Sequence, residues 1–168
     1  MKTITKITTT VCIGAILLFS SCKEDPISPE KGYSDGIFVV CEGNFNSNDG
    51  AMSFIDDTTV IKDVYNKVNG LPLGDIVQSM TIIDNKAYIV VNNSQKIEVV
   101  DVTTFKSVGT ITKLSFPRYV VKFSANEIAV SNGDGFENNY VYIINTKTLA
   151  KTDSIAVGAG PNKMLTYN

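Results

Sequence analysis

The chain has 168 residues, of which 15 are basic, 17 are acidic and none is histidine, so its formal charge is −2. This slightly acidic balance excludes a nucleic-acid binder that works through bulk positive charge, and we expect no nucleic-acid partner. The absence of histidine excludes a Ser-His-Asp triad and any histidine-ligated zinc or haem. With 43% hydrophobic and 19% charged residues, the composition is that of a folded domain with a packed core.

Residues 1–21 have the layout of an export signal. Lys2 and Lys6 precede an apolar run of nine residues from Val11 to Phe19. A membrane-spanning helix needs about 20 apolar residues, so this run is too short for a permanent anchor. Two serines then lead to Cys22, which resembles the lipoprotein signals of Bacteroidetes-type bacteria. The resemblance implies lipidation of Cys22 and anchoring in the outer membrane; the alternative is a plain secretory signal followed by an ordinary cysteine.

Residues 22–35 are predicted to form a flexible tether. Pro26 and Pro29 stiffen this polar segment, and its charged side chains keep it solvated. The run Lys23-Glu24-Asp25 resembles a surface-export signal of such lipoproteins, which implies that the domain is exposed on the cell surface. If the first cysteine leaves with the signal and Cys22 is acylated, Cys41 has no disulfide partner. Cys41 lies in an apolar, strand-like run, where we expect it to be a small buried side chain.

The rest of the chain is predicted to form strands that recur with a fixed period. Residues 22–168 contain 31 valines and isoleucines against 12 leucines and alanines, a bias typical of strands. The segment 85–92 aligns with 126–132, and 97–106 aligns with 141–149. A period near 44 residues with four short strands in each repeat is typical of a β-propeller. The alternative is a β-sandwich, whose strands recur without a fixed repeat.

We therefore predict an all-β fold, an incomplete β-propeller of four-stranded antiparallel blades with about three blades present. Residues 36–168 hold this domain: the first blade spans 36–68 and lacks its first strand, the second spans 76–111 and the third spans 120–157. Residues 163–167 are predicted to be the first strand of a fourth blade. Propellers have four to eight blades, so we interpret the chain as the N-terminal fragment of a larger propeller.

One face of this disc is predicted to carry a binding site. Because the strands of a blade run alternately up and down, the loops between second and third strands share a face with the connections between blades. These segments carry amides and aromatic side chains, which suit a large polar ligand held by neutral hydrogen bonds. The alternative for each Asn or Asp is ordinary turn chemistry. The candidate ligand-binding residues are Glu42, Asn44, Phe45, Asn46, Asp75, Asn92, Asn93, Arg118, Tyr119, Asn132, Asp134 and Phe136.

Catalytic and metal-binding patterns are weak in this sequence. The run from Asn132 to Glu137 lacks the alternating acids of a calcium loop. Paired carboxylates occur only as Glu24-Asp25 and Asp56-Asp57, which gives little support to glycosidase chemistry. We predict no catalytic residues, no metal, no cofactor and no enzyme activity.

The order of strands and turns in each repeat resembles the YncE-like, surface-layer β-propeller (YVTN repeat) family. The segments 42–45, 50–56 and 73–80 are similar to those of propeller lipoproteins of gut Bacteroidetes, in particular surface-exposed cobalamin-binding propeller lipoproteins. The resemblance covers residues 1–168. It implies capture of cobalamin or a similar corrinoid for a TonB-dependent outer-membrane transporter. The alternatives are a cell-surface interaction scaffold, or a propeller enzyme such as a lactonase or lyase.

Overall fold

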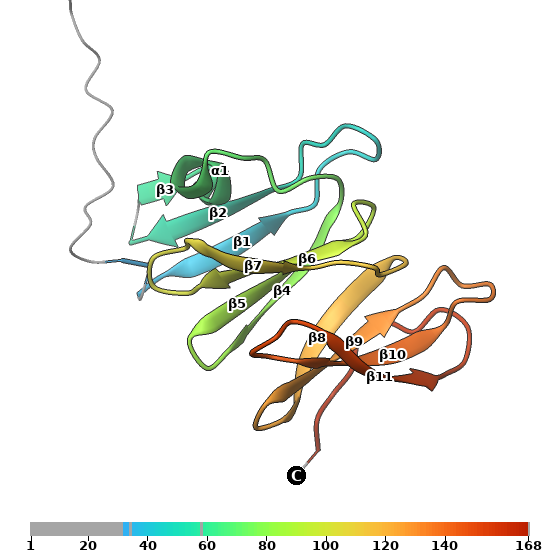
Figure 1. Cartoon of the computed structure of the whole chain (residues 1–168). Helices are drawn as coiled ribbons and strands as arrows, with labels where there is room; N and C mark the ends of the chain where they lie inside the picture. The colour runs from blue at the N-terminus through green and yellow to red at the C-terminus, as the bar shows by residue number, and fades with distance from the viewer. Residues whose placement is uncertain (1–31, 34, 58, 168) are drawn as a thin grey trace, which may run out of the picture.

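The structure, a computed structural model, describes residues 32–33, 35–57 and 59–167. The predicted export signal, Cys22 and most of the predicted tether lie outside the described residues. Within the described part, the chain forms three antiparallel sheets and one short helix (Figure 1).

Each sheet is a meander, because its neighbouring strands follow one another along the chain. We call the sheets blades 1, 2 and 3 in chain order. Blade 1 contains β1 (Ile37–Cys41), β2 (Ala51–Asp56) and β3 (Thr59–Ile61), and α1 (Val64–Asn69) follows it. Blade 2 contains β4 (Val77–Ile83), β5 (Lys86–Val91), β6 (Lys96–Asp101) and β7 (Ser107–Ile111). Blade 3 contains β8 (Pro117–Ser124), β9 (Glu127–Asn132), β10 (Tyr140–Asn145) and β11 (Lys151–Ala156).

The third and fourth strands of blades 2 and 3 are joined by the same turn. In blade 2 the Asp101 Oδ1 accepts hydrogen bonds from the backbone N–H groups of Thr103 and Thr104, at 3.1 and 2.9 Å. In blade 3 the Asn145 Oδ1 accepts from Lys147 and Thr148, both at 3.0 Å. A short side-chain acceptor that bonds its own backbone favours a turn over continued strand, so each repeat reverses at this point. These hydrogen bonds also lower the pKa of Asp101.

The three blades stack face to face as an open fan, and each junction has its own apolar core. Blade 1, α1 and one face of blade 2 enclose the first core, in which the Phe105 ring stacks on that of Phe38 with centroids 5.0 Å apart. The other face of blade 2 packs on blade 3 around Tyr88 and Ile128. The inner strands also bond directly, because the Ser79 Oγ donates to the Arg118 carbonyl at 2.6 Å. Three sheets with two separate cores confirm the all-β, incomplete propeller and exclude a single two-sheet sandwich.

The structure corrects two expectations from the sequence. Residues 161–167 contain no strand, so the predicted first strand over 163–167 is wrong. A strand needs a neighbour to pair with its N–H and C=O groups, and no described residue pairs with this segment. Cys41 is a free thiol that is half-buried rather than buried. Its Sγ lies 3.7 Å from the Ser53 Oγ of the adjacent strand.

The fully buried ring of Phe105 links blades 1 and 2, so we expect Phe105→Ala to destabilise the fold. Removing a buried phenylalanine leaves a cavity and costs about 3–5 kcal/mol. Urea denaturation followed by far-UV circular dichroism measures this loss. The matched control is Phe123→Ala, which truncates an exposed ring and should change the free energy of unfolding by less than about 0.5 kcal/mol. Equal losses in both variants would contradict the packing described here.

The raised pKa of Tyr65, in α1, predicts how the free energy of unfolding changes at alkaline pH. Burial, together with the charge of Glu98 and a hydrogen bond to it, raises the pKa of Tyr65 from 10.0 to about 12. Between these values the unfolded chain loses the phenolic proton and the folded chain keeps it. The free energy of unfolding should therefore fall as pH rises through this window, by about 2–3 kcal/mol for this group. We expect denaturation curves of Tyr65→Phe to show a shallower fall; an unchanged slope would contradict the assignment.

Candidate functional site

Three loops from blades 1 and 2 meet around one carboxylate, that of Asp75. Its Oδ2 accepts a hydrogen bond from the Asn46 backbone N–H at 2.8 Å and another from the Asn93 side-chain amide. The Asp75 backbone N–H donates to the Ser94 Oγ at 2.9 Å. The Asn93 amide also contacts the Asn46 Oδ1 at 3.3 Å. Asp75 therefore joins the β1–β2 loop to the β5–β6 turn, and we call Asn46, Asp75 and Asn93 the Asp75 cluster.

The second oxygen of Asp75 has an unmet hydrogen-bonding capacity. The residue is only 5% exposed, and its Oδ1 is buried without a partner among the described residues. Leaving a buried acceptor unpaired costs free energy, so the arrangement favours a donor that enters between the loops, from water or from a ligand. The Asp75 cluster is thus a hydrogen-bonding site that the described residues alone do not saturate.

Asn92 and Asn132 occupy equivalent places at the ends of β5 and β9, and both bond the connection between blades 2 and 3. The Asn92 amide donates to the Pro117 carbonyl at 2.9 Å, and the Asn132 Oδ1 accepts from the Ser115 N–H at 2.7 Å. Asn132 is fully buried, with its Nδ2 unpartnered among the described residues. These two candidate residues act mainly as links between blades.

Arg118 and Tyr119 lie at the start of β8, the inner strand of blade 3. Both side chains are half-buried, and the buried Nε of Arg118 lacks a partner within the described part of the chain. The Tyr119 backbone N–H donates to the Ser131 Oγ at 3.1 Å. No hydrogen bond between described residues joins either side chain to the Asp75 cluster, so these candidates stay separate from it.

The remaining candidates lie in two loops that are organised internally. In the β1–β2 loop, Glu42 is exposed and Asp49 accepts hydrogen bonds from the backbone and side-chain amides of Asn44, at 2.7 and 2.8 Å; these bonds lower the pKa of Asp49. In the β9–β10 loop, Asp134 accepts from the Phe136 N–H at 2.8 Å, which lowers the pKa of Asp134. Each loop presents an exposed aromatic ring at its tip: Phe45 is 67% and Phe136 is 85% exposed.

Sequence reasoning missed Asp49 and Ser94, although each holds a candidate residue in place. Asp49 carries a readable signal, because an acid five residues after Asn44 in a glycine-rich loop can close that loop on itself. Ser94 carries none, since its contact with Asp75 depends on how two blades meet.

Within residues 32–33, 35–57 and 59–167, no group of three or more Cys, Asp or Glu side chains is placed to hold a metal ion. The single helix of this part of the chain has six residues, so no described helix is long and apolar enough to cross a bilayer.

The Asp75 cluster predicts a local unfolding effect. In Asp75→Ala, Asn46 and Asn93 lose their common acceptor, so we expect faster amide hydrogen exchange in residues 42–50 and 92–95. The free energy of unfolding should fall by about 1–3 kcal/mol. Asp134→Ala serves as the control, because it should raise exchange only in its own loop. Unchanged protection of residues 42–50 in Asp75→Ala would refute the link between the loops.

Comparison with known proteins assigns the chain to a family. Among solved structures, the chain is similar to the WD40 β-propeller domain of Doa1, with 9% sequence identity and a TM-score of 0.46. That similarity covers 66% of this chain and 34% of the other. No curated protein matches the sequence. A family profile, described as "Domain of unknown function (DUF5074)", matches residues 35–168. Because this match covers the whole predicted domain, the chain belongs to the DUF5074 family.

Proposed function

We propose that this chain is a non-catalytic binding module of the cell surface, which captures cobalamin or a similar corrinoid on its loop face and delivers it to a TonB-dependent outer-membrane transporter. The observation that carries the proposal is the Asp75 cluster, in which a buried carboxylate oxygen has no donor in the part of the chain that the structure describes. A corrinoid has a rim of amide side chains, whose N–H groups can supply that donor. The half-buried amide of Asn93 and the backbone of Asn46 already border the same carboxylate.

The exposed aromatic rings favour a flat or bulky ligand over a small ion. Phe45 belongs to the same loop as Asn46, and most of its ring is in contact with solvent. When a partner covers a large apolar side chain, the burial of its surface away from water lowers the free energy of the complex. The polar cluster would fix the ligand's orientation, and the phenylalanine would cover part of its apolar surface.

A protein-interaction scaffold is the second candidate. It is favoured by Phe136, whose exposed ring lies in a different blade and is not bonded to the Asp75 cluster. In this case the loop tips of blades 1 and 3 would contact a macromolecular partner, and no small ligand would be needed. The lipid anchor at Cys22 and the outer-membrane location belong to either version, and they rest on the sequence pattern of residues 1–22.

Isothermal titration of the full chain with cyanocobalamin tests the proposal. We expect saturable heat at micromolar ligand, and at least tenfold weaker binding, about 1.4 kcal/mol, for Phe45→Ala and for Asp75→Asn. Phe123→Ala is the matched control, because it removes another exposed ring, near the end of β8, and should leave the affinity unchanged. Absence of heat with the folded wild-type chain would overturn corrinoid capture and favour the scaffold.

A further inference from the structure

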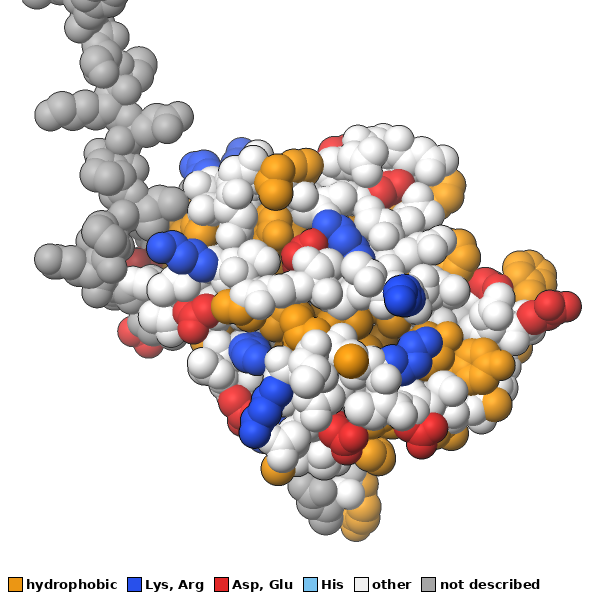
Figure 2. All heavy atoms as spheres, in the orientation of Figure 1, with side chains coloured by type: hydrophobic (Ala, Val, Ile, Leu, Met, Phe, Trp, Pro, Cys, Tyr) orange, Lys and Arg blue, Asp and Glu red, His pale blue; other side chains and the backbone are white. Residues whose placement is uncertain are grey.

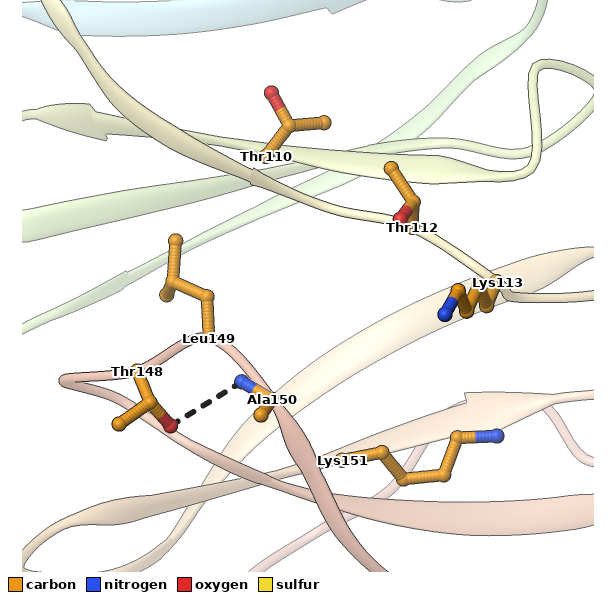
Figure 3. A pocket seen from close by; sticks show the side chains of 7 residues that line it. All are labelled: Thr110, Thr112, Lys113, Thr148, Leu149, Ala150 and Lys151. Atoms are coloured by element: carbon orange, nitrogen blue, oxygen red, sulfur yellow. Dashed lines mark hydrogen bonds between the residues drawn. The ribbon is translucent and has the colours of Figure 1, made fainter.

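A groove of about 420 Å³ lies at the junction of blades 2 and 3, away from the Asp75 cluster (Figure 3). One wall is the end of β7 and the residues after it, with Thr110, Thr112 and Lys113. The other wall is the β10–β11 turn and the start of β11, with Leu149 and Lys151. Both walls come from the outer strands, because the inner strands β4 and β8 lie next to each other.

At the corresponding place between blades 1 and 2, side chains of the chain itself pack together. There the turn equivalent to the β10–β11 turn carries Phe105, which packs on Phe38 and Tyr33 with centroids 5.0 and 5.6 Å away. Helix α1 covers the turn as well. The Asn69 Nδ2 donates to the Phe105 carbonyl at 3.0 Å, and the Asn69 Oδ1 accepts from the Ser107 N–H at 2.8 Å.

Leu149 takes the place of Phe105 in blade 3 with the same backbone. Both residues have a φ of 57°, and each N–H donates to the carbonyl four residues earlier, at 2.8 Å for Phe105 and 2.9 Å for Leu149. The Leu149 side chain reaches across to Gly109 of β7, where a Cβ would lie 2.5 Å from the Leu149 Cδ1. Leucine fills less space than phenylalanine, and no helix follows β7 to cover it. The groove is therefore the space that aromatic side chains and a helix occupy at the first junction.

The polar groups of the groove are complementary to a hydroxylated anion. Lys113 and Lys151 contribute an ammonium from each wall, and neither forms an ion pair within the described residues. The Lys151 Nζ is held 3.4 Å from the centroid of the Tyr142 ring. The Thr112 hydroxyl has no hydrogen bond in the described part, whereas the Thr110 hydroxyl points away from the groove and donates to Glu98 at 3.0 Å (Figure 3). The charge of Glu98 is already paired, with Lys96 at 2.7 Å.

We infer that this groove binds a sugar acid, such as a uronic-acid residue, free or at the end of a polysaccharide. A carboxylate between the two ammonium groups gains charge-assisted hydrogen bonds. Sugar hydroxyls pair with the Thr112 hydroxyl, and the C–H face of the ring packs on Leu149. The volume lies within the usual range of small-molecule sites, about 300–1,000 Å³. Figure 2 shows lysine or arginine side chains on both sides of a band of hydrophobic side chains between the sheets, in keeping with this combination.

Titration of the full chain with glucuronate, followed by backbone amide chemical shifts, tests the inference. We expect saturable shifts at residues 112–113 and 148–151, with no such shifts for glucose and at least tenfold weaker binding of inorganic phosphate at equal ionic strength. Lys113→Gln combined with Lys151→Gln should weaken glucuronate binding at least tenfold. Lys163→Gln, which removes an exposed lysine from the C-terminal segment, should have no effect.

A groove-filling variant separates binding in this space from general attraction of anions. Leu149→Phe places at blade 3 the residue that blade 2 already accommodates at φ 57°, so the fold should be retained and glucuronate binding abolished. Three results would overturn the inference: no shifts in the groove, equal binding of phosphate and glucuronate, or binding that persists in the folded Leu149→Phe variant. None of them depends on the outcome of the corrinoid titration.

Discussion

The fold depends on covering both faces of blade 2 with apolar side chains. The central strand β5 is buried over five consecutive residues, Ala87–Val91, which alternate between the two cores. A strand covered on both faces contains a nearly continuous run of apolar residues rather than an alternating pattern. At β5, blade 2 therefore has no polar face to expose, and this strand requires blade 1 on one side and blade 3 on the other.

This requirement also determines where polar side chains can act. Connections between blades must cross the rim of an apolar core, and their N–H and C=O groups need partners there. Asn92 and Asn132 supply such partners at the second junction, and Asp75 does so between blade 1 and blade 2. Asp75 differs because only one of its oxygens has a hydrogen-bond partner among the described residues. Ligand binding at Asp75 would therefore also stabilise the contact between two blades, and the two effects would be thermodynamically linked.

The sequence predicted the sheets because strand-forming runs and turns repeat with a 44-residue spacing, as Asp101 and Asn145 illustrate. For the same reason it predicted that the loops between second and third strands share a face with the connections between blades. The bonds of Asp75 to Asn46 and Asn93 agree with that arrangement. The sequence could not assign different roles to Asn92 and Asn93. The Asn92 amide donates to the Pro117 carbonyl, whereas the Asn93 amide donates to the Asp75 carboxylate. Neighbours in sequence thus have different partners in space. The predicted strand over 163–167 failed for a related reason, because apolar residues form a strand only where a pairing edge is present.

Blades 2 and 3 repeat the same turn between their third and fourth strands, but the turn carries Phe105 in one and Leu149 in the other. This single change gives the two junctions between blades different surfaces. The turn needs only an acceptor oxygen at its first residue, so Asp101 and Asn145 serve equally well, and the charge is dispensable. The fifth residue is under a different constraint, because its side chain points into the junction between blades. Phenylalanine closes that junction and leucine leaves it open. Since the backbone is the same in both, a new groove costs the protein buried apolar contacts at one position and no rearrangement of its sheets.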